Sequence, residues 1–166
     1  MMTLRACAVL CLSLTAPAAT FAQEVTFSPE ATMQCLQEDL TNGVACIGAS
    51  ADQCMIDTDG GDTTVGMGGC LDAERAYWDA RLNAAFGARL SEAQEADAEA
   101  ASQNVSAPSQ ETALREMQRA WIGFRDKRCA WASALWSGGT GAGPATLGCL
   151  MLTTGEQALY LENYVR

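Results

Sequence analysis

Cysteine limits what this chain can fold into more than any other residue type. The sequence holds eight cysteines and no histidine in 166 residues. Two cysteines lie in an apolar N-terminal segment that we expect to be removed, and six remain: Cys35, Cys46, Cys54, Cys70, Cys129 and Cys149. Zinc binding is the competing use, but there is no C-x-x-C pair and no histidine. An even cysteine count in an exported chain therefore predicts three disulfides, each stabilising by about 2–4 kcal/mol.

The first 22 residues have the features of a secretory signal peptide. Arg5 supplies a short positive region, residues 6–14 form an uncharged apolar run, and residues 20–22 fit a small-x-small cleavage motif. The apolar run is far shorter than the roughly 20 residues of a membrane-spanning helix. We predict cleavage before Gln23, a periplasmic or secreted product, and no membrane insertion after cleavage.

The expected mature chain is strongly acidic. Cleavage removes one charged side chain, Arg5, and leaves 9 basic against 20 acidic side chains, a net charge of −11. Nucleic acids and anionic membrane surfaces would repel such a chain, so the charge strongly disfavours both as partners, and we expect no nucleic-acid partner. The acidity fits either plain solubility or attraction to a basic partner.

Helix signals run through the mature chain. Ser28, Pro29 and Glu30 form a helix start, and Asn42-Gly43 forms a stop. Residues 44–57 suggest one or two helical turns, and residues 57–69 suggest a glycine-rich loop whose end can begin the next helix. No alternating strand pattern occurs. We predict an all-α fold, a small disulfide-stapled bundle of antiparallel helices.

Three longer helices follow, each with apolar residues at helical spacing. The first has a predicted buried stripe of Leu71, Trp78, Leu82, Ala85 and Leu90. Ser109 is expected to cap the second, whose predicted stripe is Leu114, Met117, Trp121, Phe124, Trp131 and Leu135. Pro144 is expected to open the last, which continues through Leu147, Met151, Ala158, Leu161 and Val165. The four tryptophans are accordingly expected in the core and not in a ligand groove.

The predicted order of antiparallel helices favours one disulfide pairing. Cys129 and Cys149 flank a tight turn between two antiparallel helices, so we expect them to pair. Cys54 and Cys70 flank the glycine-rich loop, and Cys35 and Cys46 would then join the first helix to the segment after it. Exchange among these last four cysteines stays open.

Candidate catalytic groups are scarce. Without histidine, neither a Ser/His/Asp nor a Cys/His arrangement is possible. Carboxylate pairs remain, Asp72 with Glu74 and Glu92 with Glu95, but their pattern is that of solvated helix faces. Arg75 and Asp79 are four residues apart and are expected to pair on the exposed face of their helix.

The acidic run at residues 57–62 does not match a calcium loop. Asp62 stands at the sixth position, where an EF-hand requires glycine, and Gly68 stands at the twelfth, where it requires glutamate. We therefore predict no catalytic, cofactor-binding or metal-binding residue, no cofactor, and no enzyme.

The run from Gln118 to Cys129, with residues 70–74 and 78–83, resembles the LprI-like lysozyme-inhibitor family of exported bacterial proteins. The resemblance covers the LprI-like helical domain at residues 54–166, preceded by the signal peptide at 1–22 and a cysteine-containing helical extension at 23–53. The family-motif residues, interpreted as scaffold, are Trp78, Leu82, Asn83, Gln118, Arg119, Trp121, Phe124, Arg125 and Asp126.

These motif residues carry two further expectations. Trp121 and Phe124 should face the core, and Arg119 or Arg125 should pair with a carboxylate, with Asp126, Asp72 and Glu74 as the candidates.

The resemblance implies a function that the residues alone do not show. It implies a non-enzymatic exported binding protein that inhibits lysozyme-like cell-wall glycosidases, and the acidity suits a cationic lysozyme. The alternative is a structural or interaction module of the envelope, whose partner is another envelope protein.

Overall fold

The computed structural model describes residues 24–39, 41 and 43–163. The predicted signal peptide and Val165 lie outside this part. The described residues are all-α and contain no strand, which confirms the predicted fold class. The elements in chain order are α1 (Glu30–Glu38), the 3₁₀ turn η1 (Val44–Cys46), α2 (Ala49–Asp57), α3 (Thr64–Ser102), α4 (Gln110–Ala134) and α5 (Ala142–Glu162).

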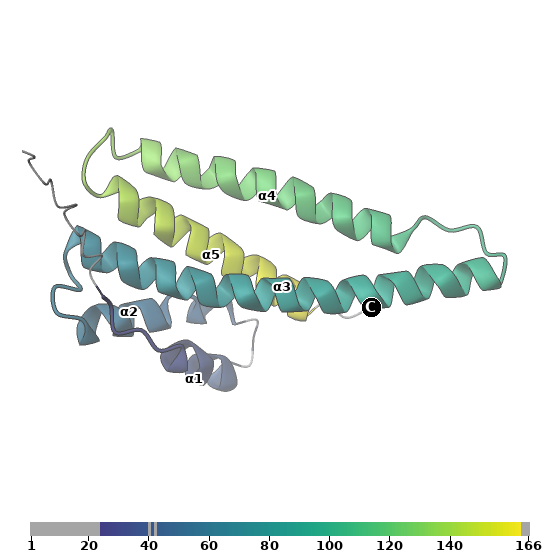
Figure 1. The fold of residues 1–166 in the computed structure, drawn as a ribbon, viewed down its shortest axis with the longest axis horizontal. Helices are drawn as coiled ribbons and strands as arrows, with labels where there is room; N and C mark the ends of the chain where they lie inside the picture. The colour runs from purple at the N-terminus through teal and green to yellow at the C-terminus, as the bar shows by residue number, and fades with distance from the viewer. Residues whose placement is uncertain (1–23, 40, 42, 164–166) are drawn as a thin grey trace, which may run out of the picture.

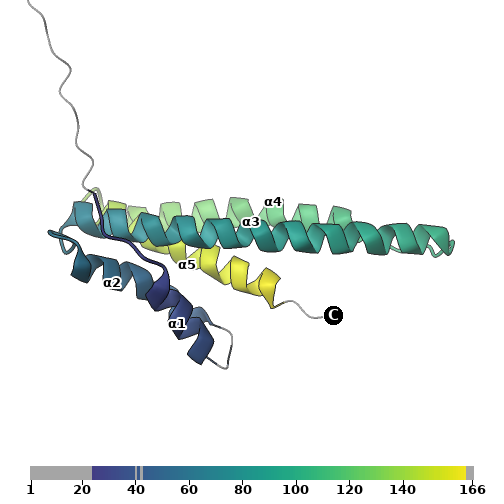
Figure 2. The same cartoon turned by 60° about the horizontal axis from the view of Figure 1, so that its bottom comes forward.

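The three long helices form the body of the molecule. α5 packs against both α3 and α4, while α1 and α2 lie on the opposite side of α3 and α5 from α4 (Figure 1). The turned view shows the same separation of α1 and α2 from α4 (Figure 2). α3 and α4 both continue past the end of α5 (Figure 1). We call this extension, which we define as residues 87–113, the arm. None of the described helices is long and apolar enough to span a membrane.

α5 is buried over most of its C-terminal half because it has neighbours on several sides. The core joins α2, α3 and α5 through Ala51, Trp78, Leu82, Ala85, Met151, Ala158, Leu159 and Leu161. Gly155 is needed for this packing, because a Cβ there would lie 2.8 Å from Ile47 Cδ1. The short N-terminal segment therefore covers one side of α5.

The disulfides include Cys129–Cys149, the pairing that the topology favoured, and they decide the exchange left open among the other four cysteines. Cys35 bonds Cys46, Cys54 bonds Cys70, and Cys129 bonds Cys149, with Cα–Cα distances of 5.5, 5.6 and 5.4 Å. Each bridge connects neighbouring elements, namely α1 to η1, α2 to α3, and α4 to α5.

The arm is closed by caps at the start of α4. Ser109 Oγ accepts from Thr112 N at 3.1 Å, as predicted. Asp97 of α3 adds a second cap, because its carboxylate accepts from Ser109 Oγ at 2.7 Å, Gln110 N at 2.8 Å and Glu111 N at 3.1 Å. α3 is thus held against the first turn of α4.

The predicted buried stripe of α4 is right in its first half and wrong in its second. Leu114, Met117 and Trp121 pack against the core. Phe124, Trp131 and Leu135 are 59%, 65% and 65% exposed. Met117, Phe124 and Trp131 recur every seven residues, and a straight helix rotates such a series by about 20° per heptad. This stripe therefore turns out of the core along α4.

Trp136 also departs from the prediction that the tryptophans lie in the core. It is 53% exposed and follows the end of α4. Trp78, by contrast, is fully buried, so only one of the four tryptophans is a fully buried core residue.

Candidate functional site

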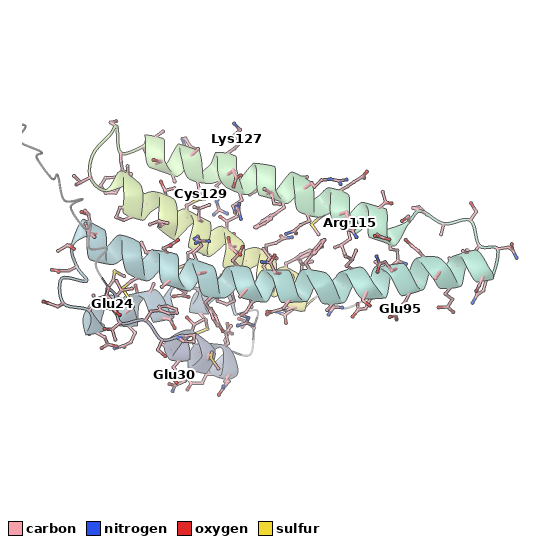
Figure 3. The ribbon with its side chains drawn as sticks, viewed as in Figure 1. Glu24, Glu30, Glu95, Arg115, Lys127 and Cys129 are labelled. Atoms are coloured by element: carbon pink, nitrogen blue, oxygen red, sulfur yellow. A yellow bond between two sulfur atoms is a disulfide. The ribbon has the colours of Figure 1, made fainter. Side chains whose placement is uncertain are left out.

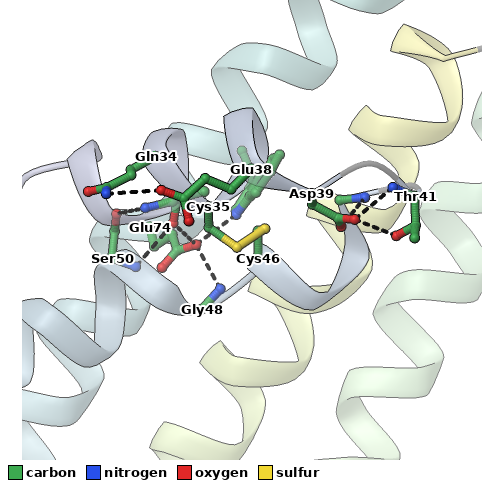
Figure 4. Close-up of a disulfide and its surroundings, with 12 residues drawn as sticks. Gln34, Cys35, Glu38, Asp39, Thr41, Cys46, Gly48, Ser50 and Glu74 are labelled. Carbon is green, nitrogen blue, oxygen red and sulfur yellow. Dashed lines mark hydrogen bonds between the residues drawn. A yellow bond between two sulfur atoms is a disulfide. The ribbon is translucent and has the colours of Figure 1, made fainter.

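Glu74 lies fully buried, at 0% exposed, so the expectation of a solvated carboxylate is wrong. Its carboxylate accepts four hydrogen bonds. Thr32 Oγ1 donates at 2.9 Å, Gly48 N at 2.8 Å, Ala51 N at 2.6 Å and Trp78 Nε1 at 2.9 Å. Figure 4 shows Glu74 near the Cys35–Cys46 bridge with the bond from Gly48. Because four donors surround its two oxygens, this carboxylate serves the fold and is not placed as a general acid or base.

The position of Glu74 follows from the start of α2. The residue preceding α2 is Gly48, which has no side chain to cap the helix. Glu74 supplies the missing acceptor from α3, and the N-terminal end of a helix favours a negative charge. A sequence signal for this role existed, since Glu74 is three residues after Leu71 and four before Trp78, on the predicted buried stripe.

Thr32 and Ser50 bind the extension to the same centre. Thr32 N donates to Ser50 Oγ at 2.9 Å, and Ser50 N donates to Thr32 Oγ1 at 3.0 Å. Both residues are fully buried. Thr32, Gly48, Ser50 and Ala51 therefore share a buried polar network with Glu74 of α3. The predicted boundary between extension and domain at residues 53 and 54 stays a prediction.

Trp78 connects this centre to a cluster of aromatic and charged groups. Tyr77 meets its ring edge-on at a centroid distance of 5.4 Å, and the Arg81 guanidinium lies 4.8 Å from the Trp78 centroid. Burial alone would lower the pKa of Arg81, but hydrogen bonds from its guanidinium to Glu162 and Tyr77 outweigh burial and raise that pKa. Arg81 thus ties α3 to the end of α5.

The motif residues of α4 do not share one environment. Gln118 accepts from Gln157 of α5 at 3.2 Å, and Arg125 lies over the partly buried Trp121 ring at 5.1 Å. Arg125 also pairs with Asp126 at 2.9 Å, one of the candidate pairings. Phe124 is exposed, which contradicts its expected place in the core.

The nine motif residues are accordingly distributed between core and surface. Trp78 and Leu82 are buried, while Asn83, Arg119, Phe124 and Asp126 are exposed. Among exposed groups of α3, Asn83 donates to Asp79 at 3.2 Å. Arg75 pairs with Asp72 at 2.6 Å and not with Asp79, because the i,i+3 carboxylate lies closer on this helix. Within the described ranges, no three histidine, cysteine or carboxylate side chains are grouped to hold a metal.

Charge is segregated between two sides of the molecule. Residues 24–63 contain eight acidic and no basic side chains. α4 contains five basic residues, Arg115, Arg119, Arg125, Lys127 and Arg128, against three acidic ones. Figure 3 shows Glu30 on the α1 side and Lys127 on the outer side of α4, with α3 and α5 between them.

Comparisons with known proteins agree with this helical domain. Residues 54–161 match the family model described as lysozyme inhibitor LprI. The chain is similar to an uncharacterized 17.7 kDa protein in the puhA 5′ region of Rhodobacter capsulatus, with 28% identity over 134 residues, 79% of this chain and 82% of that protein. No solved structure matches the chain. Because the family model covers more than half of the sequence, this chain belongs to the LprI lysozyme-inhibitor family.

Proposed function

We propose that this protein is an exported, non-enzymatic inhibitor that binds a lysozyme-like cell-wall glycosidase. The family match over residues 54–161 carries the proposal, because the family is one of inhibitors. Three disulfides support a place outside the cytoplasm, in the periplasm or beyond the cell, where disulfides persist and cell-wall glycosidases act.

We assign enzyme binding to the acidic side of the molecule, formed by α1, α2 and the loop at residues 58–63. Its exposed carboxylates include Glu30, Glu38, Asp52, Asp57 and Asp62. A cationic enzyme would be attracted to this side and repelled by the net positive α4. Complementary charge mainly accelerates association and orients the encounter, and salt weakens this effect.

A lysis assay with charge variants tests both the activity and the side that performs it. Oxidised protein is mixed with a cationic lysozyme, and clearing of a cell-wall suspension is followed at low and moderate salt. The test variant neutralises the acidic side through Glu38→Gln, Asp57→Asn and Asp62→Asn. The matched control neutralises three carboxylates of the arm through Glu92→Gln, Glu95→Gln and Glu99→Gln.

We expect the natural chain and the arm control to slow lysis, and the acidic-side variant to need several-fold more protein for the same effect. Unchanged lysis at large molar excess of the natural chain would exclude inhibition of this enzyme class. Equal weakening by the two variants would show that total charge, and not the acidic side, governs binding.

A further inference from the structure

α4 presents a second repeating face, and apart from Met117 its residues are exposed. Its residues alternate at spacings of four and three: Ala113, Met117, Ala120, Phe124, Lys127, Trp131 and Ala134. We call this face the α4 seam. Small and large side chains alternate from Ala113 to Phe124, and Lys127 then stands between the two aromatic residues. Spacings of four and three are those by which helices pack against a partner helix. A Cβ at Gly123, beside the seam, would meet nothing within 4 Å.

The seam is exposed where its aromatic residues lie. Met117, at its N-terminal end, is partly buried against Gln157, whose Nε2 lies 3.4 Å from the Met117 sulfur. Phe124 and Trp131 then turn toward solvent and are more than half exposed. Removing such rings from water is favourable by about 25 cal/mol per Å² of apolar surface, so the seam gains from a partner.

Two unpaired charges on the seam side point to the identity of that partner. Glu116 and Lys127 are exposed, and neither forms an ion pair or side-chain hydrogen bond among the described residues. They stand 11 residues apart, about three helical turns, and so share one side of α4. A second α4 running antiparallel, with Phe124 opposite Ala120 of the second copy, brings each Lys127 beside the Glu116 of the other copy.

We propose that two copies of this chain associate through their α4 seams in an antiparallel, two-fold arrangement. The two aromatic residues then face small ones, with Phe124 against Ala120 and Trp131 against Ala113 of the second copy, while Met117 faces Lys127. A two-fold interface is self-complementary in this way. It also buries the one helix with a clear positive balance, which leaves the acidic side of both copies at the outside.

Charge reversal and charge exchange test the pairing. The dissociation constant of the dimer of the full, oxidised mature chain is measured by sedimentation. Lys127→Glu and Glu116→Lys each place like charges together twice per dimer, so we expect each to weaken association about tenfold or more. The double variant, Glu116→Lys with Lys127→Glu, restores opposite charges and should return the constant to within about threefold of the natural value.

Matched controls separate this contact from total charge. Arg119→Glu changes the charge as Lys127→Glu does but lies away from the seam, and it should leave the dissociation constant unchanged. Phe124→Ser should abolish the dimer while its circular dichroism and melting temperature remain those of the natural chain, because Phe124 is exposed in one copy. A natural chain that stays monomeric at high concentration, or single reversals that the double variant does not rescue, would overturn the proposal.

Discussion

At the residue scale, the main lesson concerns Glu74. A carboxylate removed from water is unfavourable by several kcal/mol unless charge or hydrogen bonds replace its hydration. Here the replacement is a set of four donors, two of them amides at the start of α2. The sequence predicted a solvated Glu74, although its position on the apolar stripe was a signal of burial, and the sequence could not identify most of the donors. Three of the four come from residues 23 to 42 positions away, which only the fold brings near, and the fourth, Trp78, lies one turn along the same helix.

Glu74→Gln is the first prediction at this scale. The substitution keeps the side chain's shape but replaces one acceptor oxygen with an NH₂ group that faces N–H or O–H donors. We expect a loss of about 2–3 kcal/mol of unfolding free energy, since buried donors are left unpaired. The melting temperature should fall by roughly 4–12 °C, measured by circular dichroism.

Asp72→Asn is the matched control for that substitution. Asp72 is on the same helix, two residues away, and its pairing with Arg75 is half exposed. Pairs of this kind contribute about 0–1 kcal/mol, so the control should melt close to the natural chain. Equal melting temperatures for Glu74→Gln and Asp72→Asn would contradict the role assigned to Glu74.

At the element scale, α4 shows how far a periodic pattern predicts burial. Apolar spacing predicts the helix and its capping serine, and it places Leu114, Met117 and Trp121 correctly. It does not predict which side of the C-terminal half is covered. A seven-residue repeat and a 3.6-residue repeat coincide over two turns and separate over six. The position of α5 determines which side of the C-terminal half of α4 is buried. Phe124 and Trp131 could therefore not be placed from the sequence.

The arm gives the prediction that belongs to elements. Asp97→Ala removes the acceptor shared by Ser109 Oγ and the amides of Gln110 and Glu111. Loss of an N-terminal cap destabilises by about 1 kcal/mol, and here the effect should be local to the arm. We expect faster hydrogen exchange of amides near both helix ends at the tip, with little change in the core of α5. Glu95→Ala is the control, because Glu95 is two residues from Asp97 and so points to a different side of α3. This substitution should leave hydrogen exchange at the tip unchanged.

At the scale of the whole molecule, the charges and the fold together show that acidic and basic residues lie on opposite sides. The acidic run at residues 24–63 and the basic run in α4 are both visible in the sequence. Their placement on opposite sides is not, because it depends on α3 and α5 lying between them (Figure 1). Helix signals predicted the fold class and the family resemblance predicted the kind of partner, whereas the side that we propose for binding required the arrangement of the helices.

The disulfides determine whether this arrangement survives without oxidation. The three bridges close loops with sequence separations of 11, 16 and 20 residues, and each contributes about 2–4 kcal/mol. Their sum is comparable with the whole stability of a domain of this size, about 5–15 kcal/mol. We therefore predict that the reduced chain does not hold its native fold at ambient temperature.

The test must reach buried cysteines, because both cysteines of the Cys54–Cys70 bridge and one of each other bridge, Cys46 and Cys129, are at most 1% exposed. The chain is unfolded in denaturant with reductant, the denaturant is removed while the reductant is kept, and helicity and melting are followed by circular dichroism. An oxidised sample taken through the same cycle without reductant is the control and should recover fully. Because each bridge joins neighbouring elements, we expect the reduced chain to retain some helix but to lose its cooperative melt. Recovery of the natural melting temperature in the reduced sample would mean that packing and the Glu74 network hold the fold by themselves.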